Sequence, residues 1–144
     1  MKSTTSWSCI KSLLETQPIG VLATVSDKVP YTNLIAFTPI ANHKQLLFAT
    51  LKTTSKYQNI QRNNQVSICF DNRQNNKTDF HQTTTITALG TAQEVTKKEY
   101  QAQFLEKHPY LSDFVDHQDC VIINVIVSKY IIVENFQQIT TLVP

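Results

Sequence analysis

Hydroxyl and lysine side chains are concentrated in one short segment, residues 50–56, which reads TLKTTSK. An apolar run precedes this segment, and the helix-compatible sequence SKYQNIQRNN overlaps its end. Backbone N–H groups at the start of a helix lack intrahelical acceptors, so an anion can bind there, and hydroxyl and ammonium groups strengthen such a site. The segment could therefore hold a phosphate. It contains no glycine, which excludes a Walker-type phosphate loop.

The same residue types also suit a purely structural role. Thr53, Thr54 and Ser55 are all good N-caps for a following helix, and Lys52 and Lys56 could be ordinary solvated lysines. Residue chemistry alone leaves both interpretations open, a capped helix and an anion site.

The other reactive side chains form no recognisable catalytic or metal-binding pattern. The four histidines lack HxxxH or HxxE spacing, the three cysteines lack a CxxC pair, and no Ser-His-Asp or Cys-His arrangement follows from the spacing. His43 and His81 fall in polar loops and are expected to be exposed. His108, directly before a proline, is expected to be a cation at a helix C-terminus. We expect no metal site.

Composition limits the class of protein. The 144 residues suit one domain, 1–144, and no apolar run approaches the roughly 18 residues of a membrane span. The N-terminal sequence lacks the apolar region of a signal peptide, and an odd number of widely spaced cysteines indicates free thiols. These features predict a cytoplasmic protein. The net charge of +2 is too small to indicate binding to nucleic acid or an anionic membrane.

Hydrophobic periodicity then predicts the elements that position segment 50–56. Helices are expected at 5–16, about 55–63 and 96–108, and strands at 19–25, 30–37, 46–50, 66–70, 83–95, 119–127 and 129–136. Residues 26–28 should form a tight hairpin turn, and Gly90 should mark a bulge or a close backbone approach. Residues 38–45 and 71–80 are expected to be loops, the second one mobile, and Ser128 a turn.

These elements predict a mainly β protein with peripheral helices, built as an antiparallel barrel or sandwich of roughly seven strands. Several central strands are apolar on both faces. A closed barrel whose outer wall packs against a second copy of the chain would explain this pattern.

The order of these elements resembles the flavin-binding split-barrel superfamily that includes pyridoxamine 5′-phosphate oxidase. The resemblance runs from about Cys9 to Phe136 through GVLATV, PYTNLIAF, LLFATLKTTSKYQNIQRNNQVSICF, TALGTAQEV and KYIIVENF, and it is most specific over 48–70. It implies an antiparallel split β-barrel of six to seven strands, a homodimer, and flavin mononucleotide (FMN) as cofactor.

The resemblance also implies a set of cofactor-binding residues. Lys56 corresponds to the principal cationic ligand of the FMN phosphate, with Thr50, Thr54 and Ser55 beside it. Asn33, Leu34, Ile35 and Ala36 correspond to the strand that faces the isoalloxazine ring. Thr38 matches a position that is often cationic in the oxidase. Thr85 matches a residue that commonly reaches the flavin across the dimer interface.

The chain departs from the family at several positions. Ser55 and Asn33 stand where arginine is usual, and Lys28 replaces the glycine of the usual hairpin turn. The C-terminal sequence QQITTLVP has no match to the basic residues that bind the pyridoxal phosphate group. The resemblance therefore predicts a cofactor and leaves the small-molecule substrate unknown.

Three hypotheses follow from this comparison. The first is a flavin-dependent oxidoreductase, for which the sequence identifies no general acid or base. The second is a non-catalytic split-barrel protein that carries or senses flavin, haem or another tetrapyrrole. The third is a structural dimer without a ligand.

Overall fold

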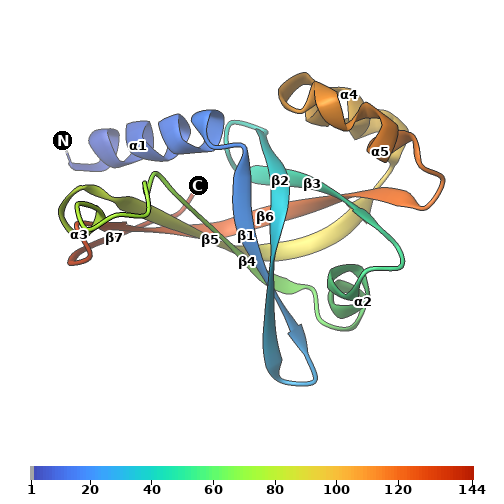
Figure 1. Cartoon of the computed structure of the whole chain (residues 1–144), viewed down its shortest axis with the longest axis horizontal. Helices are drawn as coiled ribbons and strands as arrows, with labels where there is room; N and C mark the ends of the chain where they lie inside the picture. The colour runs from blue at the N-terminus through green and yellow to red at the C-terminus, as the bar shows by residue number, and fades with distance from the viewer. Residues whose placement is uncertain (1) are drawn as a thin grey trace.

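The computed structural model describes residues 2–144, and side chains from Ser6 onwards. Figure 1 shows a strongly twisted sheet with helices around it. In chain order the elements are α1 (Lys2–Thr16), β1 (Ile19–Ser26), β2 (Val29–Ile40), β3 (Gln45–Leu51), α2 (Ser55–Arg62), β4 (Gln65–Asp71), α3 (Asp79–Gln82), β5 (Thr84–Val95), α4 (Lys97–Lys107), η1 (Pro109–Leu111), α5 (Ser112–Asp116), β6 (Cys120–Glu134) and β7 (Gln138–Leu142).

The sheet closes into a barrel of six antiparallel strands. Its strand order is β3-β2-β1-β4-β5-β6-β7, and an additional β3–β6 pairing joins the first strand to the sixth. The seventh strand, β7, extends the sheet beyond β6. The fold class predicted from the sequence, a mainly β antiparallel split barrel, is confirmed.

One hydrophobic core fills the barrel, and helices contribute to it from opposite sides. Ile10 and Leu14 of α1 and Ile60 of α2 belong to the same buried cluster as Phe37 and Phe70 of the barrel. The two helices lie at opposite ends of the molecule (Figure 1). Both amphipathic helices are therefore held by burying their apolar faces, because helices of this length are only marginally stable alone in water.

A smaller apolar cluster lies outside the barrel. It joins Leu47 of β3 and Ile122 of β6 to Phe104 of α4 and Val115 of α5, all buried. Helices α4 and α5 therefore cover the outer face of these two strands, and Figure 1 shows both helices at the upper right of the molecule.

Strand β6 differs from the sequence-based prediction of two strands joined by a turn at Ser128. It runs unbroken from Cys120 to Glu134. Its register against β5 passes from Lys129, opposite Leu89, to Val127, opposite Gly90, so Ser128 is the extra residue of a β-bulge. The Ser128 hydroxyl donates a hydrogen bond of 3.0 Å to the Leu89 carbonyl. The prediction of a bulge at Gly90 is confirmed, and the prediction of a turn at Ser128 is wrong.

Other element boundaries also differ from the predicted ones. Strand β2 continues to Ile40, which shortens the predicted loop 38–45 to a turn in which Ala41, Asn42 and His43 all have positive φ angles. Strand β7 and the short helices α3, η1 and α5 were not predicted. The two-residue hairpin turn at Asp27 and Lys28 was predicted, and both residues have positive φ.

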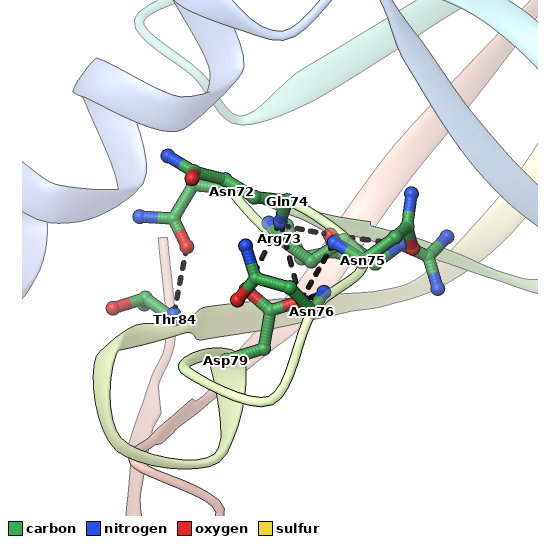
Figure 2. A network of polar contacts seen from close by, with 8 residues as sticks. Asn72, Arg73, Gln74, Asn75, Asn76, Asp79 and Thr84 are labelled. Atoms are coloured by element: carbon green, nitrogen blue, oxygen red, sulfur yellow. Dashed lines mark hydrogen bonds and ion pairs between the residues drawn. The ribbon is translucent and has the colours of Figure 1, made fainter.

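Residues 72–79, within the predicted mobile loop, are organised around one carboxylate (Figure 2). Asp79 accepts hydrogen bonds from the backbone N–H groups of Gln74, Asn75 and Asn76, the shortest at 2.8 Å. The bond from Gln74 is the largest cause that holds the pKa of Asp79 below its ordinary value. The Asn72 side chain accepts the Thr84 N–H at 2.9 Å, which joins this loop to β5.

Among the residues that the structure describes, there is neither a membrane-spanning helix nor a metal-binding cluster. No helix there is long and apolar enough to cross a membrane. No group of three or more histidine, cysteine, aspartate or glutamate side chains among these residues is arranged to hold a metal ion. Cys9, Cys69 and Cys120 are free thiols.

Candidate functional site

The threonines at the end of β3 cap helix α2. Thr54 is the N-cap residue, and its hydroxyl oxygen accepts the Tyr57 N–H at 3.4 Å. The same hydroxyl donates to the Leu51 carbonyl at 2.9 Å and lies 2.9 Å from the Thr50 hydroxyl. Thr50 itself is 1% exposed. Thr54 therefore caps the helix, as its residue type suggests, and the Thr50 hydroxyl is hydrogen-bonded to the capping hydroxyl.

Capping leaves the first helical residues available to an anion. Ser55 and Lys56 are the first two residues of α2, and within the described residues their backbone N–H groups have no acceptor. Helix α2 has no acidic residue in its first turn. The positive end of the helix dipole is thus not neutralised by a side chain of the helix itself.

Lys56 is the electrostatically unusual residue of this segment. Its side chain is partly buried, and desolvation lowers the pKa of its ammonium group. Within the described residues it has neither an ion pair nor a hydrogen bond. A partly desolvated cation without a counter-charge gains more from an approaching anion than a fully solvated lysine does. Capping of the helix by Thr54 does not by itself require a partly buried lysine at position 56.

The barrel is split beside this segment. Strands β2 and β3 pair only where Phe37–Ile40 meets Gln45–Phe48, whereas β3 continues to Leu51 paired with β6 alone. Residues 33–36 of β2 pair with β1 along one edge, and their opposite edge has no strand partner among the described strands. Asn33 on this segment has a buried Oδ1 atom with no hydrogen-bond partner within the described residues. Unpaired main-chain and side-chain groups of this kind can bind the polar edge of a ligand.

The neighbours of the unpaired edge differ in exposure. Leu34 is 67% exposed, whereas Ile35 is 5% exposed and belongs to the barrel core. Ala36 packs against the smaller cluster under α4 and α5. Side chains alternate across the strand, so Leu34 and Ala36 share the outward face, where Leu34 is exposed and Ala36 is partly buried.

Two predicted site residues lie apart from segment 50–56. Thr38 lies beyond the split, where β2 pairs with Leu47 of β3. Thr85 pairs with Asp71 and Val133 at the start of β5. The other end of β5 approaches α2, because the Tyr57 hydroxyl donates to Glu94 at 3.1 Å. At ~3.3 Å per residue, Thr85 lies roughly 30 Å along the strand from that end.

His108 is not the solvated cation expected from its position after a helix. It is 0% exposed, and its Nε2–H donates to the Phe37 carbonyl at 2.7 Å. The Tyr110 hydroxyl lies 3.1 Å from Nδ1 and donates a hydrogen bond to it. Desolvation is the main cause that lowers the pKa of His108, so the ring is neutral at pH 7. His43, also expected to be exposed, has a side chain that is only 17% exposed.

Because His108 is buried as the neutral ring, the protein is expected to lose stability in acid. A pKa lowered on folding means that the unfolded chain binds more protons just below about pH 6.5, so the stability present above that pH is lost as the pH falls. The slope from this residue is at most about 1.4 kcal/mol per pH unit. Urea unfolding of His108→Gln at pH 7.5 and 5.5 should show a smaller pH dependence than wild type.

The exposed His81 provides the control for this measurement. His81→Gln should keep the wild-type slope. An equal slope in wild type and His108→Gln would show that His108 does not cause the acid sensitivity.

The chain is similar to a known protein family and to several solved structures. A family model described as pyridoxamine 5′-phosphate oxidase matches residues 8–129. No curated protein sequence matches the chain.

Several solved structures share the fold at low sequence identity. A haem-binding protein from Mycobacterium smegmatis has a TM-score of 0.84 at 13% identity, covering 96% of this chain and 57% of that protein. General stress protein 26 from Bacillus anthracis has a TM-score of 0.74 at 18% identity, covering 95% and 98%. A FAD-binding protein from Mesorhizobium loti has a TM-score of 0.66 at 15% identity, covering 85% and 90%. The chain thus spans little more than half of the haem-binding protein.

Proposed function

Because the chain belongs to the pyridoxamine 5′-phosphate oxidase family, we propose that it is an FMN-binding flavoprotein, with residues 1–144 as one cofactor-binding domain. The observation that carries this proposal is Lys56, a partly buried ammonium group beside free helix N–H groups and without a counter-charge. A FAD-binding protein among the structural neighbours gives further support.

The residues present fit a phosphate group at the start of α2. Lys56 would supply the charge, and the N–H groups of Ser55 and Lys56 would donate hydrogen bonds together with the exposed Ser55 hydroxyl. Thr50 and Thr54 would support the site by holding the cap. Ser55 cannot provide the bidentate clamp that arginine would provide, so we expect a weaker phosphate site than the family usually has.

The unpaired edge of β2 would bind the isoalloxazine ring. Asn33 to Ala36 offer backbone groups there, and the exposed Leu34 offers an apolar surface. When bound, the flavin would supply hydride or electron transfer, while the protein supplies binding and orientation.

A homodimer is part of this proposal. Leu34, Val21, Cys69 and Thr87 lie side by side across four strands on the outer wall, because Val21 is paired with both Leu34 and Cys69, and Cys69 with Thr87. All four side chains are uncharged, and Ile19 of the same wall is 51% exposed. A second copy packed on this wall would bury it. Thr85, remote from Lys56 in its own chain, could then reach only the partner's cofactor.

Within this proposal, a flavin-dependent oxidoreductase with an unknown small-molecule substrate and electron donor is the first possibility. The second is a protein that carries or senses flavin or haem without catalysing a reaction. A haem-binding structural neighbour favours keeping this second possibility. We also propose a cytoplasmic location, which the three free thiols support because a reducing compartment keeps cysteines unpaired.

Titration with FMN tests the proposal. The expected result is one FMN per chain, a flavin absorption spectrum altered by binding, a raised melting temperature, and a complex with the mass of two chains by light scattering. With dioxygen excluded, reoxidation of the nicotinamide-reduced flavin by an added small-molecule acceptor, which is itself reduced and released, would support an enzyme, and inert bound flavin would support the carrier.

The same preparation should be titrated with haem. Saturable haem binding with no response to FMN would contradict the flavoprotein proposal. No response to either ligand would favour a structural dimer.

A further inference from the structure

A hollow of about 430 Å³ lies between the C-terminal end of α1, the end of β2 with its following turn, and α4. Its polar lining consists of Glu15, Thr38, His43, Gln103, Glu106 and Lys107. Thr38 is the only residue of the proposed FMN site among the lining residues. The volume lies within the range of roughly 300–1,000 Å³ that is typical of small-molecule sites.

Two buried polar atoms of this lining lack a hydrogen-bond partner within the described residues. They are Oγ1 of Thr38 and Nδ1 of His43. Thr38 is only 6% exposed, so its hydroxyl cannot be satisfied by bulk solvent. Buried polar groups are nearly always paired in folded proteins, and two exceptions at one hollow indicate a place for a ligand. The side chains of Gln103 and Glu106, which line the same hollow, are exposed.

The hydrogen-bonding roles at this hollow favour a ligand that donates. His43 Nε2 lies 3.1 Å from a carboxylate oxygen of Glu15, which can only accept, so Nε2 carries the proton. In the neutral ring Nδ1 is then an acceptor. The turn holds His43 in place, because the Tyr130 hydroxyl donates to the His43 carbonyl at 2.6 Å.

The charges at this hollow favour a cation. Glu15 and Glu106 contribute two carboxylates. Lys107 directs its ammonium group toward α1, where it donates to the carbonyls of Leu14 and Gln17 at 2.7 and 2.8 Å. Burial lowers the pKa of Lys107 to about 8. Two of the three N–H donors of the Lys107 ammonium group are therefore used at the helix end, whereas the Glu106 carboxylate has no partner within the described residues.

We propose that this hollow binds a small organic cation that carries a primary ammonium or guanidinium group. The cationic group donates to His43 Nδ1 and to the Glu106 carboxylate, and the Thr38 hydroxyl completes its surroundings. This site shares only Thr38 with the proposed FMN site, so Glu106→Gln tests the cation site without touching a residue proposed to bind FMN.

Calorimetric titration of the full chain with agmatine, which carries both groups, tests the site. Butylammonium, neutral 1-butanol and butyrate serve as matched probes. Agmatine and butylammonium should bind saturably, and the two other probes should not. Glu106→Gln should weaken agmatine binding about tenfold, because it removes one charge-assisted hydrogen bond.

Two further variants separate binding from folding. Glu99→Gln makes the same change in the first turn of the same helix, outside the hollow, and should leave agmatine binding unchanged. Thr38→Val keeps the shape and removes the unpaired hydroxyl, so it should weaken binding without lowering the melting temperature. The proposal is overturned if no cation binds, if butyrate binds in preference, or if Glu106→Gln and Glu99→Gln behave alike.

Discussion

Replacing Lys56 with methionine should weaken FMN binding about ten- to a hundredfold. A charge-assisted hydrogen bond contributes about 1.5–3 kcal/mol, and each ~1.4 kcal/mol corresponds to a factor of ten in affinity. The unliganded variant should nevertheless be at least as stable as wild type. Burial lowers the pKa of Lys56 without a compensating partner, and methionine keeps the aliphatic packing while removing the cost of burying the charge. Fluorescence titration and thermal melts with and without FMN measure both effects.

Lys52 is the matched control, because it is an exposed lysine in the same turn. Lys52→Met should leave FMN affinity within about twofold of wild type at moderate salt, where exposed charges are screened. If the two variants lost affinity equally, the effect would come from general positive charge and not from a phosphate site at α2.

Replacing Gly90 with alanine should destabilise the protein by about 2–3 kcal/mol, a loss expected when extra volume is forced into a packed core. A Cβ atom at this position would lie 2.4 Å from the backbone oxygen of Ile126 and 2.8 Å from Cγ1 of Val125. The backbone cannot move aside here, because β5 and β6 are paired on both sides of the bulge. Urea unfolding should show the loss, together with a fall in melting temperature of roughly 5–10 °C.

Gly20 provides the comparison within the same barrel. Its nearest obstacle to a Cβ atom is the Ile68 side chain at 3.1 Å, which can shift, so Gly20→Ala should cost about 1 kcal/mol or less. Equal stabilities of Gly90→Ala and Gly20→Ala would contradict the close approach at the bulge.

The bulge also illustrates what local sequence reveals. Gly90 interrupts a strand of otherwise alternating side chains, and this interruption predicted the irregularity correctly. Ser128, the partner of that irregularity, looked like a turn because a polar pair, Ser128 and Lys129, follows a long apolar run. Only the β5–β6 register shows that one extra residue is accommodated within a continuous strand.

Strand β7 had no comparable signal. It is an edge strand, QITTL, with three polar residues among its five, and the preceding turn uses Asn135 and Phe136 at positive φ without any glycine. Its pairing with β6 comes from tertiary context, which local propensity does not record.

The two candidate sites also differ in how far the sequence alone reveals them. Residues 50–56 are contiguous, so the sequence identified both the cap and the possible anion site. Their roles in binding FMN stay predictions, as do those of Asn33 to Ala36, Thr38 and Thr85. The hollow beside α1 joins residues from positions 15 to 107, and no spacing rule brings these together. His108 was misjudged because the sequence places it after a helix without revealing that α4 lies against β2.

The ratio of the affinities of the wild-type protein for FMN and for riboflavin tests the central claim most directly. The two ligands differ only in the phosphate group, so the ratio isolates the contribution of the site at Ser55 and Lys56. We predict that FMN binds at least about tenfold more tightly than riboflavin. Equal affinities, or no binding of FMN at all, would contradict the assignment of this segment as a phosphate site.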